Sequence, residues 1–407
     1  MLKEDSKWYF YFLMIFLCFN DIFDSYSTNF PNSVMHEVID YFPITESTYL
    51  LAIGIASIGM YFVFFNQYLA DLFGRRLLLF ITLLGIGITS IFISISQNFI
   101  QYIISLFFLY IFFSSDIWQI YLSEQSSEKH RGKLISLVLV FGAVGGALTI
   151  PIFRALLLPS FGWRAMTWFA FIAIPIAFLI FLFKEPKVFK LNKKKITNKS
   201  KQVNIIDNLK KIFDKRILKS TITIALLGFA IGFNYVFLLS GEQFLVEYRS
   251  LSSSEVDFVI LILGFGAILG YILAGVISDY IGRKPVIYIF SILGAPGILM
   301  LIFGDYLFII LGAFIVSVAY WALFVTSRTI AYEIYPTDIR GTGAGFRSLC
   351  YALGVTLGSI STAFTLIYIG LGWSYLLNSI LLIIMLPLVI LFIKETKGIK
   401  LDTIELI

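Results

Sequence analysis

Twelve stretches of this sequence are each long and apolar enough to cross a lipid bilayer as a helix, for which about 20 mainly apolar residues are needed. The chain is 59 % hydrophobic and 14 % charged, whereas a soluble domain carries about 25 % charged residues. We therefore predict an all-α membrane protein and exclude soluble, fibrous and disordered classes. The runs lie near residues 8–31, 48–70, 77–96, 99–122, 133–156, 165–183, 220–241, 256–278, 286–303, 306–332, 342–368 and 372–393.

The basic residues predict how the chain is oriented. Lysine and arginine gather in one set of alternating connections, which includes Arg75, Arg76, Arg283 and Lys284. Connections rich in Lys and Arg stay on the cytoplasmic side. We therefore predict a multi-pass protein of the cell membrane with both termini in the cytoplasm. The net charge of +6 then reflects topology, and no nucleic-acid partner is expected.

One long polar stretch, residues 184–219, divides the runs six and six. We predict an N-terminal bundle over 1–183, a cytoplasmic linker over 184–219 and a C-terminal bundle over 220–407. The linker holds thirteen Lys and Arg residues. Its apolar residues recur at helical spacing, which indicates an amphipathic helix on the inner membrane surface; a merely solvated linker is the alternative. The residues at this spacing are Val203, Ile206, Leu209, Lys210 and Phe213.

The two halves resemble each other at an offset of 208 to 210 residues. Asp71-Leu-Phe-Gly-Arg-Arg76 matches Asp279-Tyr-Ile-Gly-Arg-Lys284, and Glu124 with Arg131-Gly132 matches Glu333 with Arg340-Gly341. Phe161-Gly-Trp-Arg164 matches Leu371-Gly-Trp-Ser374, and Lys184-Glu-Pro-Lys187 matches Lys394-Glu-Thr-Lys397. Six helices per half is an even number, so the repeats share one orientation, as in transporters built from parallel repeats.

These motifs resemble those of the major facilitator superfamily. Asp-x-x-Gly-Arg-Arg/Lys after the second and eighth runs looks like its signature loop, and the remaining motifs are similar to the sugar-porter and organic-acid:proton symporter branch. The resemblance covers the whole chain. It implies twelve helices in two six-helix bundles, a cavity lined by helices one, four, seven and ten, and transport by alternating access.

Some positions depart from the sugar porters. Gln67 stands where the first signature loop usually has glycine, and Leu139 stands where sugar porters carry a glutamine on helix five. Their glutamine pair on helix seven is also replaced, within Leu227–Asn234. A cavity without these amides offers few partners for a ring of hydroxyls, so these positions favour another substrate.

Two acidic residues lie within the first run. Asp21 and Asp24 share one helix face, ~20 and ~24 Å along the helix from Trp8. An ionised carboxylate in a membrane span costs several kcal/mol, which makes both candidates for proton coupling. Asp24 aligns with the acid of the Gly-Tyr-Asp motif of proton-coupled sugar porters, and the pair resembles the Asp-Gly-Phe-Asp motif of aromatic-acid:proton symporters. Alternatively, both face the outer water without a function.

Asp116 and Arg328 lie on the fourth and tenth runs, which the resemblance places at the cavity. Either Arg328 binds a substrate carboxylate, or the two residues form an ion pair that acts as an inner gate. Six further residues on cavity-type helices are candidate substrate contacts, with simple packing as the alternative for the aromatic ones. They are Trp118, Gln119, Asn234, Tyr235, Tyr320 and Trp321.

The charged residues at the cytoplasmic ends of the helices form a candidate latch, which would pair across the two halves when the inside is shut. A purely topological role of the arginines is the alternative. The latch set is Asp71, Arg75, Glu124, Arg131, Asp279, Arg283, Glu333, Arg340 and Arg347. For Arg347, within the eleventh run, attraction of anions is the alternative. Arg154, near the end of the fifth run, is expected to reach the outer surface instead of binding a ligand.

Together these features predict a secondary transporter, not an enzyme, and no cofactor or metal. We expect a monomer in the lipid bilayer that moves a small organic acid by proton symport. A sugar or polyol porter is the close alternative, and a drug or metabolite exporter is the third. Cys18 and Cys350 provide neither a disulfide framework nor a metal cluster, and no Walker-type loop is present for ATP-driven pumping.

Overall fold

The computed structural model describes residues 7–112, 117–126, 128–185, 210–335 and 339–397. These residues form two compact units, the first made of residues 1–42 and 56–202 and the second of residues 43–55 and 203–407.

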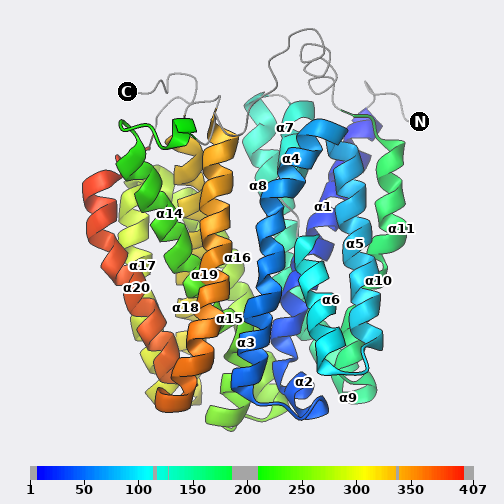
Figure 1. The fold of residues 1–407 in the computed structure, drawn as a ribbon, viewed down its shortest axis with the longest axis vertical. Coiled ribbons are helices and arrows are strands. Elements are labelled where there is room, and N and C mark those ends of the chain that lie inside the picture. The colour runs from blue at the N-terminus through cyan, green and yellow to red at the C-terminus, as the bar shows by residue number, and fades with distance from the viewer. Residues whose placement is uncertain (1–6, 113–116, 127, 186–209, 336–338, 398–407) are drawn as a thin grey trace. The chain divides into compact units, whose positions relative to one another are not determined.

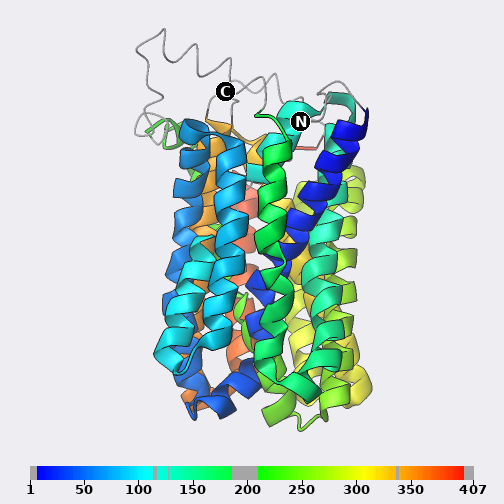
Figure 2. The same ribbon diagram turned by 90° about the vertical axis from the view of Figure 1, so that its right-hand side faces the viewer.

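Helices of the first unit run alongside one another, with α1 oblique to its neighbours (Figures 1 and 2). The helices of this unit from the N-terminus to the linker are α1 (Lys7–Asn29), the 3₁₀ turn η1 (Phe30–Ser33), α2 (Met35–Tyr41), the 3₁₀ turn η2 (Ser57–Phe62), α4 (Val63–Phe73), α5 (Arg75–Ile95), α6 (Phe99–Ile111), α7 (Ile117–Gln125), α8 (Glu128–Val144), the π segment η3 (Gly145–Thr149), α9 (Ile150–Phe161), the 3₁₀ turn η4 (Trp163–Thr167), α10 (Trp168–Phe171), α11 (Ala173–Phe178) and the 3₁₀ turn η5 (Leu179–Leu182). The helix α3 (Glu46–Ala56) belongs to the second unit except for its last residue.

The second unit has longer uninterrupted helices. Within it α17 packs on α18, α16 on α18, and α14 on α19. Its helices after the linker are α14 (Leu218–Phe233), α15 (Val236–Gln243), the π segment η6 (Phe244–Tyr248), α16 (Ser253–Ile281), α17 (Arg283–Phe303), α18 (Tyr306–Glu333), α19 (Arg340–Ile369) and α20 (Leu371–Phe392).

Each predicted apolar run corresponds to one helix or to consecutive helices. Among the described residues, nine spans meet the length and hydropathy expected for crossing a membrane, or up to ten if the bent pair Met35–Tyr41 and Glu46–Phe62 counts as one. The first run is α1, whose hydropathy is lowered by Asn20, Asp21 and Asp24. The fourth run is α6 and α7, on either side of residues 113–116. The prediction of an all-α membrane fold is confirmed.

Apolar side chains also cover the outside of the helices. In α16, Phe258, Phe265, Ile272 and Val276 follow a spacing of seven or four residues, and each is about half exposed. Such a spacing places them on one face of the helix. A face of this kind is unfavourable in water and suits contact with lipid.

The internal repeat extends to the geometry of the helix ends. Gly74, before α5, has φ +112°, and Gly282, before α17, has φ +103°. In the first unit, the Glu185 carboxylate accepts hydrogen bonds from the backbone N–H of Arg75 and Arg76, at 2.6 and 3.2 Å. In the second, the Glu395 carboxylate accepts from Arg283 and Lys284, at 2.8 and 3.1 Å. Both carboxylates thus satisfy free donors at a helix N-terminus, where negative charge is favoured.

One anchor of the repeat is shifted in the structure. Gly162 and Gly370, with φ +73° and +77°, each end one helix and precede the next. The structural partner of Gly162 is therefore Gly370, and the match of Gly162 with Gly372 in the sequence alignment is wrong by two residues. The local Gly-Trp similarity misled the alignment because the positive φ, not the tryptophan, defines this junction.

The predicted amphipathic helix of the linker lies mostly outside the described residues. Of its apolar positions only Phe213 is described, together with Lys210. The neighbouring Ile212 is fully buried against Tyr335 and Ile339, and Phe213 packs on Phe346. The end of the linker is therefore anchored on the second unit.

Replacing Gly282 by alanine should destabilise the protein, and replacing Gly275 should not. A Cβ on Gly282 would lie 2.6 Å from Oε2 of Glu395 in a left-handed conformation, whereas a Cβ on Gly275, also on the α16 segment, would meet nothing within 4 Å. We expect Gly282→Ala to cost about 1–3 kcal/mol. Thermal unfolding of the detergent-purified variants tests this, and equal midpoints for the two variants would contradict the proposed cap.

Candidate substrate and proton sites

Asp21 lies where α1 packs against α8. The two helices approach so closely that a Cβ on Gly142 of α8 would collide with Oδ2 of Asp21, and one on Gly145 would collide with the backbone of Ile22. Asp21 is only 8 % exposed. The carboxylate therefore lies in a seam between two membrane helices, which only a glycine at position 142 leaves open.

Asp24 lies one turn further along α1 and is 7 % exposed. The hydroxyl of Thr28 donates to its backbone carbonyl. On another face of α1, the hydroxyl of Tyr26 donates to the carbonyl of Met166, and Phe23 packs on Phe169. These contacts fix the rotation of α1, and both predicted acids are buried within the first unit and not exposed to open water.

An aromatic cluster occupies the second unit, formed by Tyr235, Tyr271, Tyr320, Trp321, Phe324 and Tyr351. Tyr271 stacks on Trp321 with ring centroids 5.3 Å apart. The hydroxyl oxygens of Tyr320 and Tyr351 are 2.9 Å apart, within hydrogen-bond distance. The rings come from α16, α18, α19 and the break between α14 and α15, so four parts of this unit contribute to one aromatic surface.

Two arginines border this aromatic cluster. The guanidinium carbon of Arg328 lies 5.4 Å from the ring centroid of Phe324, and that of Arg347 lies 5.1 Å from the same centroid. Both distances are within the range of cation–π attraction. Arg328 is half-buried, whereas Arg347 is 2 % exposed.

A small cavity lies beside the aromatic cluster in the second unit. It measures about 30 Å³, and Asn234, Tyr320, Tyr375 and Asn378 supply polar groups to its wall. The side chain of Asn234 donates to the carbonyls of Ala230 and Asn378, both at 2.9 Å. The carbonyl of Ala230 also accepts from the backbone N–H of Asn234, so the side chain adds a second hydrogen bond at the break between α14 and α15. The cavity has room for water only, not for a metabolite.

The predicted substrate residues divide into three groups. The structure brings Tyr235, Tyr320, Trp321 and Arg328 together at the aromatic cluster, with Asn234 next to it. Trp118 is 3 % exposed within the apolar core of the first unit, and Gln119 is half-buried beside it on α7. Asp116 lies outside the described residues, so its predicted ion pair with Arg328 stays a prediction.

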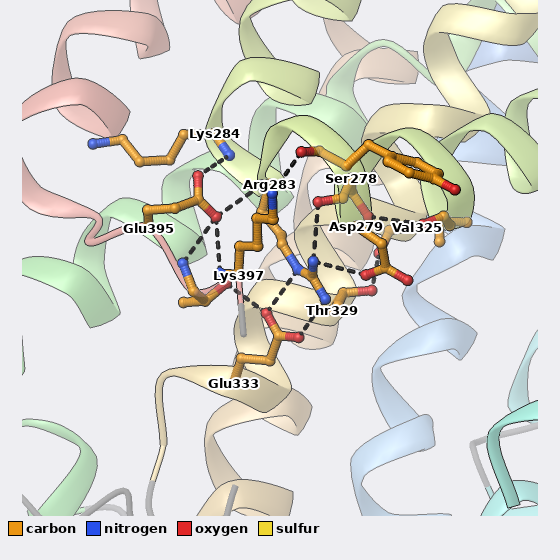
Figure 3. Close-up of polar contacts among 12 residues, drawn as sticks. Ser278, Asp279, Arg283, Lys284, Val325, Thr329, Glu333, Glu395 and Lys397 are labelled. Carbon is orange, nitrogen blue, oxygen red and sulfur yellow. Dashed lines mark hydrogen bonds and ion pairs between the residues drawn. The ribbon is translucent and has the colours of Figure 1, made fainter. Parts of the chain in front are cut away.

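Charged residues at the ends of α16, α17 and α18 form a network around Arg283 in the second unit (Figure 3). Its guanidinium lies 2.8 Å from Asp279 and 3.0 Å from Glu333, and it also donates to the carbonyl of Ser278. Thr396 donates its hydroxyl to Glu333 at 2.5 Å. Three predicted latch residues of one unit are therefore held together, and their pairing with the other unit stays a prediction.

Glu395 links this network to the start of α17. Partial burial acts to raise the pKa of Glu395, but the backbone N–H groups of Arg283, Lys284, Thr396 and Lys397 outweigh it and hold that pKa below its ordinary value. A lowered pKa in the folded protein adds stability at neutral pH, and this contribution is lost as the pH falls through the folded value.

The latch residues of the first unit are described only in part. The side chain of Arg75 is buried and donates to the carbonyl of Ala70 at 3.3 Å. The side chains of Asp71, Glu124 and Arg131, and that of Arg340 in the second unit, lie outside the described part of the structure. Their latch role remains a prediction.

Arg154 does not extend to the outer surface, so that expectation is wrong. It is 2 % exposed, pairs with Glu37 at 3.0 Å and donates to the carbonyl of Ser33. The short helix α2 folds over the end of the first unit and supplies the carboxylate. The pairing was not predictable from the sequence because α2, which carries Glu37, lies between two predicted apolar runs, where no helix was expected.

Tyr271, Phe324 and Tyr351 were not predicted from the sequence, and for Arg347 the latch was favoured over the attraction of anions. A signal was present on α18, where Tyr320, Phe324 and Arg328 recur at intervals of four residues, and on α19, where Arg347 precedes Tyr351 by four. Residues at this spacing share a helix face. Glu185 and Glu395 were also not predicted as helix caps, although both belong to matching motifs of the repeat.

Known proteins share both the sequence pattern and the fold of this chain. This chain is 22 % identical to a Cupriavidus pinatubonensis protein named "Probable 4-methylmuconolactone transporter". The match covers 83 % of this chain and 79 % of that relative. The chain is 26 % identical, over 82 % of each, to the "Cis,cis-muconate transport protein" of Acinetobacter baylyi. Its fold matches an inward-open structure of the xylose transporter XylE from E. coli with a TM-score of 0.74, at 19 % identity and over 97 % and 98 % of the two chains.

The sequence profile described as Major Facilitator Superfamily matches residues 14–244 and 225–404, which together span most of the chain. With two halves built on one repeat, membrane-spanning helices throughout and relatives named as transporters, this multi-pass membrane protein belongs to the major facilitator superfamily, and it is a transporter of a small molecule, not an enzyme.

Proposed function

We propose that this transporter moves a small organic acid together with protons, by alternating access. The observation that carries the proposal is Arg328, a cation on the membrane-spanning helix α18 whose guanidinium lies 5.4 Å from the centroid of Phe324 in the aromatic cluster. A guanidinium offers a carboxylate two parallel hydrogen bonds, and its attraction is strong where water is excluded. The rings around it suit the apolar body of such an acid.

The polar groups near the aromatic cluster support an acid more than a sugar. They include the two arginines and the hydroxyls of Tyr320 and Tyr351, which are close enough to bond each other. The amides of Asn234 and Asn378 are also near, but both already donate within the protein, Asn234 to the carbonyls of Ala230 and Asn378, and Asn378 to the hydroxyl of Thr362. Leu139 and Leu227 offer no amides on the helices where sugar porters use them. A site for a polyhydroxylated ring must pair most of the hydroxyls that it buries. The relative named for muconate transport points to an organic anion as well.

The proton would bind at Asp24, with Asp21 one turn away. Both carboxyl groups are enclosed in the first unit, where an ionised carboxylate is costly. Protonation removes the charge and allows the site to change conformation without exposing a bare carboxylate to lipid. Asp21, held in the seam against Gly142, places a second acid one helical turn from Asp24.

We further propose that the protein works as a monomer in the cell membrane, with both termini and the linker in the cytoplasm. The basic linker and the Arg and Lys residues at the start of α5 and α17 support this orientation. The charges around Arg283 would then lie at the cytoplasmic end and act as part of a latch.

Asp24→Asn should uncouple transport from the proton gradient. An amide imitates the protonated acid, so we expect binding and counterflow to be retained. Accumulation driven by an imposed pH gradient should fall at least tenfold. Uptake of organic acids into proteoliposomes measures this, with sugars and polyols as parallel substrates. Asp21→Asn should show a milder loss.

Asp40→Asn is the matched control, because Asp40 is an acid whose side chain is 69 % exposed outside the predicted spans. It should behave like the wild type. If Asp24→Asn still concentrates an acid in a pH-driven way, Asp24 is not the coupling site. If the pH gradient drives uptake of sugars or polyols but not of acids, the proposed substrate class is wrong.

Arg283→Ala should slow transport about tenfold, or ~1.4 kcal/mol in the barrier, with less effect on binding. The variant leaves Asp279 and Glu333 without the cation that they share. We expect this loss to change the populations of the transporter's conformations more than the affinity of the substrate site. Exchange rates and binding of the same ligand test this. Arg216→Ala, at an exposed site paired with Asp214, is the control. Lost binding with normal exchange between conformations would refute the latch role.

Cysteine labelling in intact cells tests the orientation. In a background without Cys18 and Cys350, Ser254→Cys at the start of α16 should react with a membrane-impermeant maleimide. Ser200→Cys in the linker should react only after the membrane is permeabilised. Labelling of position 200 from outside would reverse the proposed topology.

A further inference from the structure

Two arginines of the second unit share one aromatic ring. The guanidinium carbons of Arg328 and Arg347 lie 5.4 and 5.1 Å from the centroid of Phe324, so they are no more than about 11 Å apart. They come from different helices, α18 and α19. Two guanidinium groups that border one ring from different helices offer binding positions for two negative groups of one ligand.

Arg347 is held firmly in its place. Its Nη2 donates to the hydroxyl of Ser327 at 2.6 Å, and its guanidinium lies 5.4 Å from the ring centroid of Tyr351. Its side-chain stem lies against Gly228 of α14, where an added Cβ would be 3.2 Å from its Cγ. Contacts from α14, α18 and α19 therefore fix its direction, and a preorganised cation binds an anion at little cost in ordering.

The surroundings of the two arginines are flat and aromatic. Trp321 stacks on Tyr271, and Tyr351 contacts Phe324 edge to face at 5.2 Å. Rings of this kind bind a flat organic frame through their faces and edges. A compact tetrahedral anion such as phosphate would use the charges but not these rings, so the surroundings favour an organic anion.

We propose that Arg328 and Arg347 bind the two carboxylates of one flat, unsaturated or aromatic dicarboxylate, with the aromatic cluster around its frame. This inference rests on the proposed transport of organic acids and narrows it to dianions. Each guanidinium would form paired hydrogen bonds to one carboxylate. Arg347, predicted from the sequence as part of the latch, would then act in substrate selection. The two roles predict different effects of its replacement on the binding of dicarboxylates.

The test compares dicarboxylates with their own monoamides, which keep the shape and lose one charge. Phthalate against 2-carbamoylbenzoate and fumarate against fumaramate give two frames with closely spaced carboxylates, and benzoate serves as a simple monocarboxylate. Binding is measured by ligand-induced thermal stabilisation and by calorimetry on the purified full-length protein. We expect the wild type to bind at least one dicarboxylate ten or more times more tightly than its monoamide.

Arg347→Gln and Arg328→Gln should each reduce this ratio to below threefold, because only one carboxylate would still meet a guanidinium. Arg216→Gln removes an exposed cation of the same unit and should leave the ratio unchanged. Ser327→Ala keeps Arg347 but removes the hydroxyl that orients it, and should lower the ratio at least threefold. It tests the same point if Arg347→Gln does not fold.

The outcomes separate this inference from the proposed function. If the wild type binds benzoate and the dicarboxylates but does not distinguish any dicarboxylate from its monoamide, the two-arginine site is wrong while organic-acid transport stands. A tenfold ratio that persists in folded Arg347→Gln, or in Ser327→Ala, also overturns the role of Arg347 and returns it to the latch. If none of these carboxylates binds, both proposals fail.

Discussion

Close packing of paired helices through glycine determines where the ionisable side chains of this transporter lie. In the first unit, α1 approaches α8 so closely that the Asp21 carboxylate occupies the space of a missing Cβ at Gly142. In the second, α14 approaches α19, and Gly228 accommodates the stem of Arg347. Charged groups are costly inside a membrane protein. A charged group that is buried in such a seam has fixed protein neighbours and does not contact lipid.

The fold could be predicted almost completely because hydropathy is a local property. A run such as 256–278 requires no knowledge of its neighbours, and it became α16 within a few residues at each end. The breaks within runs were not predictable. The π segment Gly145–Thr149 and the interruption at Asn234 depend on partners elsewhere, as the hydrogen bond from Asn234 to the carbonyl of Asn378 shows. Hydropathy carries no record of such partners.

The candidate site was predictable only along single helices. Tyr320, Trp321 and Arg328 were selected because α18 is a cavity-type helix, and the structure does bring them together with Tyr235. Tyr271 and Tyr351 were missed because their part in the cluster depends on how α16 and α19 are rotated against α18. Glu395 was recognised as a repeated motif without a role, since the donors that it satisfies are 111 and 112 residues away along the chain.

The proposed roles divide between the units, and this division has a consequence for coupling. The acids that would carry the proton belong to the first unit, and the arginines that would carry the substrate belong to the second. Neither ligand needs to touch the other, because two ligands are coupled whenever both bias the same equilibrium between conformations. The coupling free energy is then limited by how differently each ligand binds the two conformations. A dianion held by two fixed arginines would bind the two conformations with very different affinities, because a small change in the distance between α18 and α19 would weaken both ion pairs at once.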